Sequence, residues 1–311
     1  MRSRFRSLVV VVPLGVALLA SACSSASASG SSDSTGGKIV AVGAENEYAN
    51  VLAQVGGKYV QVSAIMSNPA TDPHTFEASA SVARLVSAAQ LVVQNGVGYD
   101  GFMNIIENAA PNSSRKVIVV QDLLGLPAST PNPHLWYQPG TMPAVANAIA
   151  ADLATLQPAH ASYFKANAAA FTGSLTAWDH AIAAFKATYP LAPVATTEPV
   201  ADYMLQAIGA DNLTPFAFQA DIMNGTDPSA QNVTVERSLF TQHKVKVLLY
   251  NQQVTNSLTE SFITLARANG IPVVGVYETM PVPGYDYQSW MLAEVQDLRN
   301  AVVSKISTEH L

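Results

Sequence analysis

The sequence contains a single cysteine, Cys23, so no disulfide bond can form within the chain. Charged residues make up only 12% of its 311 positions, and the net charge of −6 argues against a nucleic-acid partner. The longest apolar run near the start, residues 8–19, is shorter than the roughly 20 residues that a membrane-spanning helix needs. Hydrophobic residues still account for 49% of the chain, which is enough for sizeable cores.

The first residues have the pattern of a secretory signal peptide. Arginines at three of the first six positions precede the apolar run, and small residues at positions 20–22 lead directly to Cys23. A lone cysteine after such a site resembles a bacterial lipobox, whose cysteine is acylated. We therefore predict a signal peptide over residues 1–22, lipidation of Cys23 and a flexible Ser-, Ala- and Gly-rich tether over residues 23–37. The mature chain is then exported and anchored to the outer face of the cytoplasmic membrane.

Strand-like and helix-like segments alternate in both halves of the mature chain. In the first half we expect strands over residues 38–42, 59–66, 90–94 and 116–120, with helices over residues 48–55, 81–89 and 102–109. The alternation returns between residues 194 and 277, and an amphipathic helix over residues 287–306 follows it. This order predicts parallel sheets with helices on both faces.

The middle of the chain is rich in alanine and carries no strand signal. After Pro158, apolar residues recur at helical spacing, as in a buried core helix or in a stiff connector; its length and position favour the connector. We predict an α/β fold of two lobes, each a parallel sheet flanked by helices. The N-terminal lobe covers residues 38–157, a long connector helix covers residues 158–188, and the C-terminal lobe covers residues 189–311. A ligand is expected in the cleft between the lobes.

Two short loops of matched form each place a histidine directly after a proline. They are Asp72-Pro73-His74 and Asn132-Pro133-His134. Proline fixes its own φ and restricts the residue before it, so the loop that presents each histidine is stiff. Stiff presentation suits a metal ligand, whose nitrogen lies about 2.0–2.1 Å from an ion such as zinc.

Carboxylates follow two predicted strands of the C-terminal lobe. Glu198 comes after the strand that ends near residue 197, and Glu278 comes after the strand that ends near residue 277. Ligands of parallel sheets gather at the carboxyl ends of the strands, so both side chains could meet the two histidines in the cleft. Tyr250 and Asn251, at another strand end, are candidates for a supporting layer around the site, or simply belong to a polar loop.

The chain resembles the metal-binding lipoproteins of bacterial ABC importers for zinc and manganese, along nearly the whole mature sequence. The resemblance rests on NPATDPHTFEASAS from position 68, VVQNGVGYDGFM from position 92 and NPHLWYQP from position 132. It implies a metal site formed by His74, His134, Glu198 and Glu278. Tyr203 stands five residues after Glu198, where the family usually has an aromatic residue, and is a further candidate for the supporting layer.

The resemblance also implies a function. We expect extracytoplasmic capture of a divalent metal by a monomer and delivery to a membrane permease and its ATPase, without catalysis. The alternatives are a secreted metallohydrolase and a surface adhesin with a structural metal. Residues 75–133 contain no histidine, and Glu198 stands where zinc importers often have a third histidine. Manganese is therefore favoured over zinc, with ferrous iron as a minor option.

A glycine pattern in the first lobe could suggest a different ligand. Gly96, Gly98 and Gly101 spell G-x-G-x-x-G after a predicted strand, and Asp122 lies about 20 residues further on, as in dinucleotide-binding sites. The glycines follow the third strand rather than the first, however. We predict instead that they form a tight turn between a strand and a helix.

Overall fold

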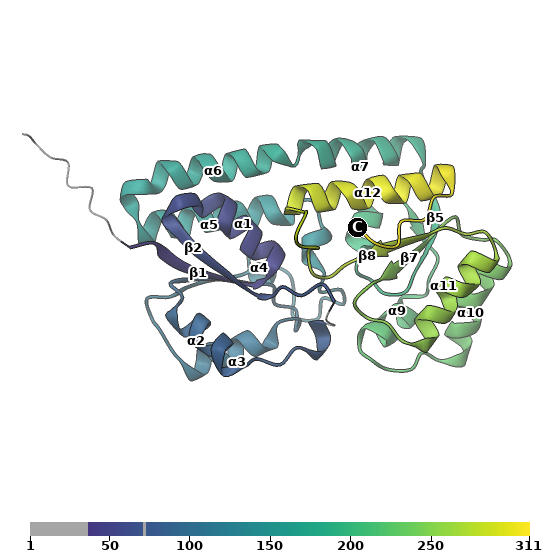
Figure 1. The fold of residues 1–311 in the computed structure, drawn as a ribbon, viewed down its shortest axis with the longest axis horizontal. Helices are drawn as coiled ribbons and strands as arrows, with labels where there is room; N and C mark the ends of the chain where they lie inside the picture. The colour runs from purple at the N-terminus through teal and green to yellow at the C-terminus, as the bar shows by residue number, and fades with distance from the viewer. Residues whose placement is uncertain (1–36, 71–72) are drawn as a thin grey trace, which may run out of the picture. The chain divides into compact units, whose positions relative to one another are not determined.

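The computed structural model describes residues 37–70 and 73–311. Its strands form two four-stranded parallel sheets, with the orders β2-β1-β3-β4 and β6-β5-β7-β8 (Figure 1). The two α/β lobes predicted from the sequence are therefore confirmed. The predicted signal peptide, Cys23 and nearly all of the predicted tether lie outside the described residues. Within the described part, no helix is long and apolar enough to cross a lipid bilayer.

The first sheet and its helices follow the predicted alternation. The strands are β1 (Ile39–Glu45), β2 (Val60–Met66), β3 (Leu91–Gln94) and β4 (Lys116–Val119). The helices are α1 (Asn46–Gly56), α2 (Ala80–Ala88), α3 (Gly101–Ala109), α4 (Val120–Leu123) and α5 (Thr141–Leu156), with short 3₁₀ turns at Gly57–Tyr59, Pro73–Thr75 and Leu135–Tyr137.

Alternate residues of β1 contribute to two different cores. Ile39 and Ala41 pack with α1 and α5, whereas Val42 and Ala44 pack with α2 and α3. Figure 1 shows these two pairs of helices on opposite sides of the sheet. Burial on both faces explains why the strand is apolar almost throughout, as parallel strands usually are.

The second sheet is covered in the same way. Its strands are β5 (Pro193–Thr196), β6 (Asp211–Asn212), β7 (Leu248–Asn251) and β8 (Val273–Val276). Its helices are α8 (Asp202–Ile208), α9 (Phe216–Met223), α10 (Ala230–Thr241), α11 (Ser257–Ala268) and α12 (Tyr287–Ser304). Neither β6 nor α9 was predicted, because a two-residue strand and an eight-residue helix are too short to show a clear spacing of apolar residues.

The predicted connector consists of two helices in line rather than one. A 3₁₀ turn at Pro158–His160 leads into α6 (Ala161–Ser174), and α7 (Thr176–Thr188) follows after a break at Leu175 (Figure 1). The break comes directly after Gly173-Ser174, a pair at which helices commonly bend. At 1.5 Å per residue the two helices together extend over roughly 40 Å.

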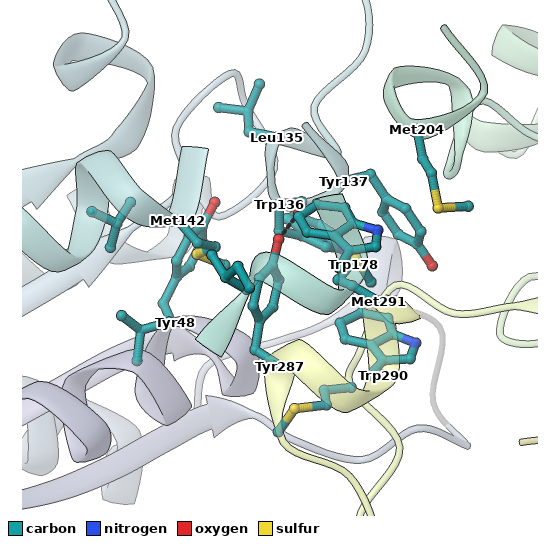
Figure 2. Packing of buried hydrophobic residues seen from close by; sticks show 14 of the residues in the cluster. Tyr48, Leu135, Trp136, Tyr137, Met142, Trp178, Met204, Tyr287, Trp290 and Met291 are labelled. Carbon is teal, nitrogen blue, oxygen red and sulfur yellow. Dashed lines mark hydrogen bonds between the residues drawn. The ribbon is translucent and has the colours of Figure 1, made fainter. Parts of the chain in front are cut away.

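One buried core reaches into both sheets. It includes Ile39 of the first sheet and Val274 of the second, together with large aromatic side chains from α7, α12 and the 3₁₀ turn at Leu135–Tyr137. Figure 2 shows Trp136, Trp178 and Trp290 gathered around Tyr287, whose hydroxyl donates a hydrogen bond to the carbonyl of Trp136. The two lobes therefore share packed side chains, which favours a rigid connection between them.

Candidate metal centre

Three of the four predicted ligands come together at one point. The ligand atoms of His74, His134 and Glu278 lie within 4.8 Å of one another. The Nε2 atoms of both histidines are 3.2 Å from the same oxygen, Oε2 of Glu278. His134 and Glu278 are fully buried, whereas the side chain of His74 keeps 23% of its surface exposed.

The tautomer of His134 is set by its own loop. Asn132 Oδ1 accepts a hydrogen bond from the backbone N–H of His134 at 3.0 Å and lies 2.7 Å from Nδ1 of the ring. The amide nitrogen of Asn132 donates to the carbonyl of Pro199, which confirms that the oxygen faces the imidazole. Nδ1 therefore carries the proton, and Nε2 turns its lone pair toward Glu278. Burial lowers the pKa of His134, so the neutral, metal-binding form dominates at neutral pH.

Glu278 is held by hydrogen bonds at its backbone and at both carboxylate oxygens. Its backbone N–H donates to Gln253 at 2.7 Å, Oε1 accepts from the amide of Asn251 at 2.7 Å, and Oε2 accepts from the hydroxyl of Tyr99 at 2.8 Å. Burial opposes its ionisation, but each of its two oxygens accepts a hydrogen bond, which favours the ionised form. The site therefore presents a carboxylate to two imidazole nitrogens.

Glu198 lies next to these three residues but outside the 4.8 Å set. It is buried at the end of β5, and its Oε2 accepts a hydrogen bond from Asn251 at 3.0 Å. The same amide nitrogen bonds Glu278, so Asn251 bridges the two carboxylates. The backbone N–H of Asn251 in turn donates to Thr197, which fixes the bridge to the strand that carries Glu198.

Of the three residues predicted to support the site, two contact it and one lies elsewhere. Asn251 bridges the two carboxylates, and the hydroxyl of Tyr203 donates to the carbonyl of Asn132 at 2.9 Å, so it braces the loop of His134. The prediction for Tyr250 is wrong. Its side chain packs in the core of the C-terminal lobe with Phe262, because successive residues of a strand point to opposite faces and Asn251 faces the site.

Several residues at the site were not predicted from the sequence. Tyr99, Asn132, Gln253 and Trp136 all contact or orient a ligand, and Trp136 packs edge-on against His134 with ring centroids 5.4 Å apart. Asn132 had a signal, since it belongs to one of the two histidine motifs. Tyr99 stands in the segment VVQNGVGYDGFM, but nothing in the sequence pairs it with Glu278, which is 179 residues away.

The glycine pattern forms a turn, as predicted, and its loop faces a predicted metal ligand, Glu278. Gly96 and Gly98 have φ values of 81° and 76°, between β3 and α3. Asp122 lies in α4, directly after β4. Tyr99, between the glycines and α3, points its hydroxyl at Glu278.

Fold and site together define a two-lobed protein in which two histidines of the first lobe and a carboxylate of the second lie close enough to hold a metal ion. The chain matches the family model described as zinc-uptake complex component A, periplasmic, over residues 42–301, and it belongs to that family. Members of the family are substrate-binding proteins of ABC transporters rather than enzymes.

Individual relatives are distant. The metal ABC transporter substrate-binding lipoprotein FimA of Streptococcus parasanguinis is 25% identical over 86% of this chain and 88% of its own length. The manganese-binding lipoprotein MntA of Bacillus subtilis (strain 168) is 26% identical over 40% of this chain and 42% of its own. A Treponema pallidum (strain Nichols) relative is 27% identical over 52% of this chain, which spans about half, 56%, of that protein.

Solved structures share the fold. A crystal structure of ZnuA has a TM-score of 0.70 at 22% identity, covering 86% of this chain and all of that one. The periplasmic zinc binding protein TroA from Treponema pallidum has a TM-score of 0.71 at 18% identity, covering 86% of this chain and 98% of that one.

Proposed function

We propose that this protein captures a divalent transition-metal ion outside the cytoplasm and delivers it to an ABC importer. The observation that carries the proposal is the set of contacts around Oε2 of Glu278. Two imidazole nitrogens lie 3.2 Å from this oxygen, and the lone pair of at least the His134 nitrogen faces it. Two acceptors that face each other in a buried site repel unless a proton or a metal ion lies between them.

Glu198 is the proposed fourth ligand. Its carboxylate is buried and shares the amide of Asn251 with Glu278, so a small displacement of either side chain would let both reach one ion. The complete set is then His74, His134, Glu198 and Glu278, from both lobes. Such a set fills the coordination sphere of the ion and leaves no position for a substrate, whereas a catalytic zinc site keeps one open.

The proposed cargo is Mn²⁺ ahead of Zn²⁺, with Fe²⁺ as a minor option. The two carboxylates supply oxygen donors, which suit manganese, whereas imidazole suits zinc and iron as well. Intrinsic affinity follows the Irving–Williams order and favours zinc, so selection of manganese depends on site geometry and on the metal available. The name of the Bacillus subtilis relative supports manganese, and the name of the family supports zinc.

Delivery involves a permease and an ATPase in the membrane. We propose that Cys23 is acylated and tethers a monomer to the outer face of the cytoplasmic membrane, as the names of two lipoprotein relatives suggest. The core shared by the two lobes favours release through small movements of loops rather than wide opening. An adhesin with a structural metal is the rival function, and it requires that loss of the protein leave metal uptake unchanged.

Metal analysis of the protein isolated from its native envelope, followed by competition titration of the metal-free form, tests the proposal. We expect one equivalent of a divalent transition metal, and Mn²⁺ should protect the fold against heating. Stoichiometric zinc that Mn²⁺ cannot replace would contradict the choice of ion. If His74→Ala retained every metal with unchanged affinity, the site itself would be wrong.

A further inference from the structure

Tyr99 is fixed in place by the turn that follows β3. The carboxylate of Asp100 accepts hydrogen bonds from the backbone N–H groups of Asn95 and Gly96, at 2.6 and 2.9 Å. The amide of Asn95 donates to the carbonyl of Pro133 at 2.8 Å, which ties this turn to the loop that carries His134. The backbone around Tyr99 is therefore held from two directions.

The ring of Tyr99 is locked by aromatic neighbours. Its centroid lies 5.1 Å from that of Trp136, 5.9 Å from that of His134 and 5.5 Å from that of His74, each in an edge-on arrangement. Packing against three rings restricts rotation of the side chain and holds its hydroxyl near Glu278. That hydroxyl donates to Oε2 of Glu278 at 2.8 Å.

The two oxygens of Glu278 thus receive donors from opposite lobes. Tyr99 bonds Oε2 and Asn251 bonds Oε1, at 2.8 and 2.7 Å. A carboxylate oxygen has two lone pairs, so Oε2 keeps one for an ion between the histidines. Rotation that would turn both oxygens toward the histidines has to break one or both of these hydrogen bonds.

We propose that Tyr99 is a positioning residue that determines metal specificity by holding Glu278 so that only Oε2 binds the ion. This inference rests on the proposed function, since it concerns which metal ion the same site binds more tightly. With the hydroxyl removed, Glu278 becomes free to bind through both oxygens. An added oxygen donor raises the coordination number, which benefits ions that accept six ligands, such as Mn²⁺, more than Zn²⁺, which favours four.

The test compares Tyr99→Phe with the wild type, and Tyr189→Phe at the end of α7 is the matched control. Phenylalanine removes one oxygen and keeps the ring contacts, and the melting temperature of the metal-free variant checks the fold. Competition titrations should show Zn²⁺ affinity reduced by about 10–100-fold, the usual effect of losing an outer partner of a ligand. Mn²⁺ affinity should fall less or rise, so that the Mn²⁺-to-Zn²⁺ ratio of dissociation constants decreases by at least about 10-fold.

A spectroscopic signature separates this role from a merely structural one. Co²⁺ bound to the wild type should show the strong visible absorption of a low coordination number, and Tyr99→Phe should weaken it. Equal losses of affinity for both metals, or an unchanged Co²⁺ spectrum, overturn the inference. If the wild type binds no divalent metal, the proposed function fails instead.

A crystal structure of the metal-loaded wild type gives a check that needs no variant. We expect Oε2 of Glu278 alone at a coordination distance of about 2.0–2.2 Å for zinc. A second Glu278 oxygen at that distance, or the Tyr99 oxygen itself bound to the ion, overturns the assignment.

Discussion

The two lobes have the same strand order but supply different chemistry to the site. In each sheet the second strand lies outside the first, followed by the third and the fourth. The N-terminal half contributes histidines from loops, of which His74 stays partly exposed, whereas the C-terminal lobe contributes Glu198 and Glu278 almost directly from strand ends. A buried carboxylate needs fixed donors, and strand ends provide them, while a neutral imidazole tolerates a loop.

Removal of the buried histidine should have the largest effect. His134→Ala deletes the imidazole whose tautomer Asn132 fixes, and we expect metal affinity to fall by more than the roughly 100-fold that loss of an outer partner costs. Isothermal titration with Mn²⁺ and Zn²⁺ measures the affinity of the variant for each metal. His180→Ala, at an exposed position of α7, is the control and should bind as the wild type does. Near-normal metal affinity in His134→Ala would show that His134 is not a metal ligand.

The two carboxylates can be ranked against each other. Glu278→Gln should cost about as much affinity as His134→Ala, because Oε2 of Glu278 faces both histidines. Glu198→Gln should cost less, roughly 10–100-fold, because Glu198 lies outside the 4.8 Å set and reaches it through Asn251. The exposed Glu260→Gln serves as control. The reverse ranking would mean that the ion lies closer to β5 than to β8.

A buried glutamate links the histidine loop to β8 and should make stability depend on pH. Glu294 accepts from Trp290 and lies 3.2 Å from the hydroxyl of Tyr137, which donates at 2.8 Å to the carbonyl of Tyr277, next to Glu278. Burial raises the pKa of Glu294 from 4.5 to about 8.

The sign of this effect follows from proton counts. Between about pH 4.5 and 8, Glu294 is protonated in the folded chain and ionised in the unfolded one, so the free energy of unfolding falls as pH rises. Glu294→Gln should remove this contribution, at most about 1.4 kcal/mol per pH unit. Urea melts of both proteins at several pH values measure the difference in slope. Parallel slopes would show that Glu294 ionises normally in the fold.

The smallest expected effect is a change of shape on metal binding. Since the core that includes Trp136 and Trp290 reaches into both sheets, the lobes should move little. Small-angle scattering of the metal-free and loaded forms should therefore give nearly equal radii of gyration. A large decrease on loading would show that the shared core opens.

Local signals predicted most of the fold, and long-range contacts account for what they missed. The alternation of β1, α1 and β2 was visible because each element has its own period, and His74 and His134 stood out because proline precedes both. Tyr250 was misjudged because the two faces of a strand could not be told apart from its sequence. The hydrogen bond of Tyr99 depends on a partner in the other lobe.

Anomalous diffraction from metal-loaded crystals, recorded at the manganese and zinc edges, shows directly whether the ion binds where the three side chains converge. We expect one anomalous peak bonded to Nε2 of His74, Nε2 of His134 and Oε2 of Glu278, where these atoms already face one another. A peak bonded to none of these three atoms, or no peak after loading, would contradict it.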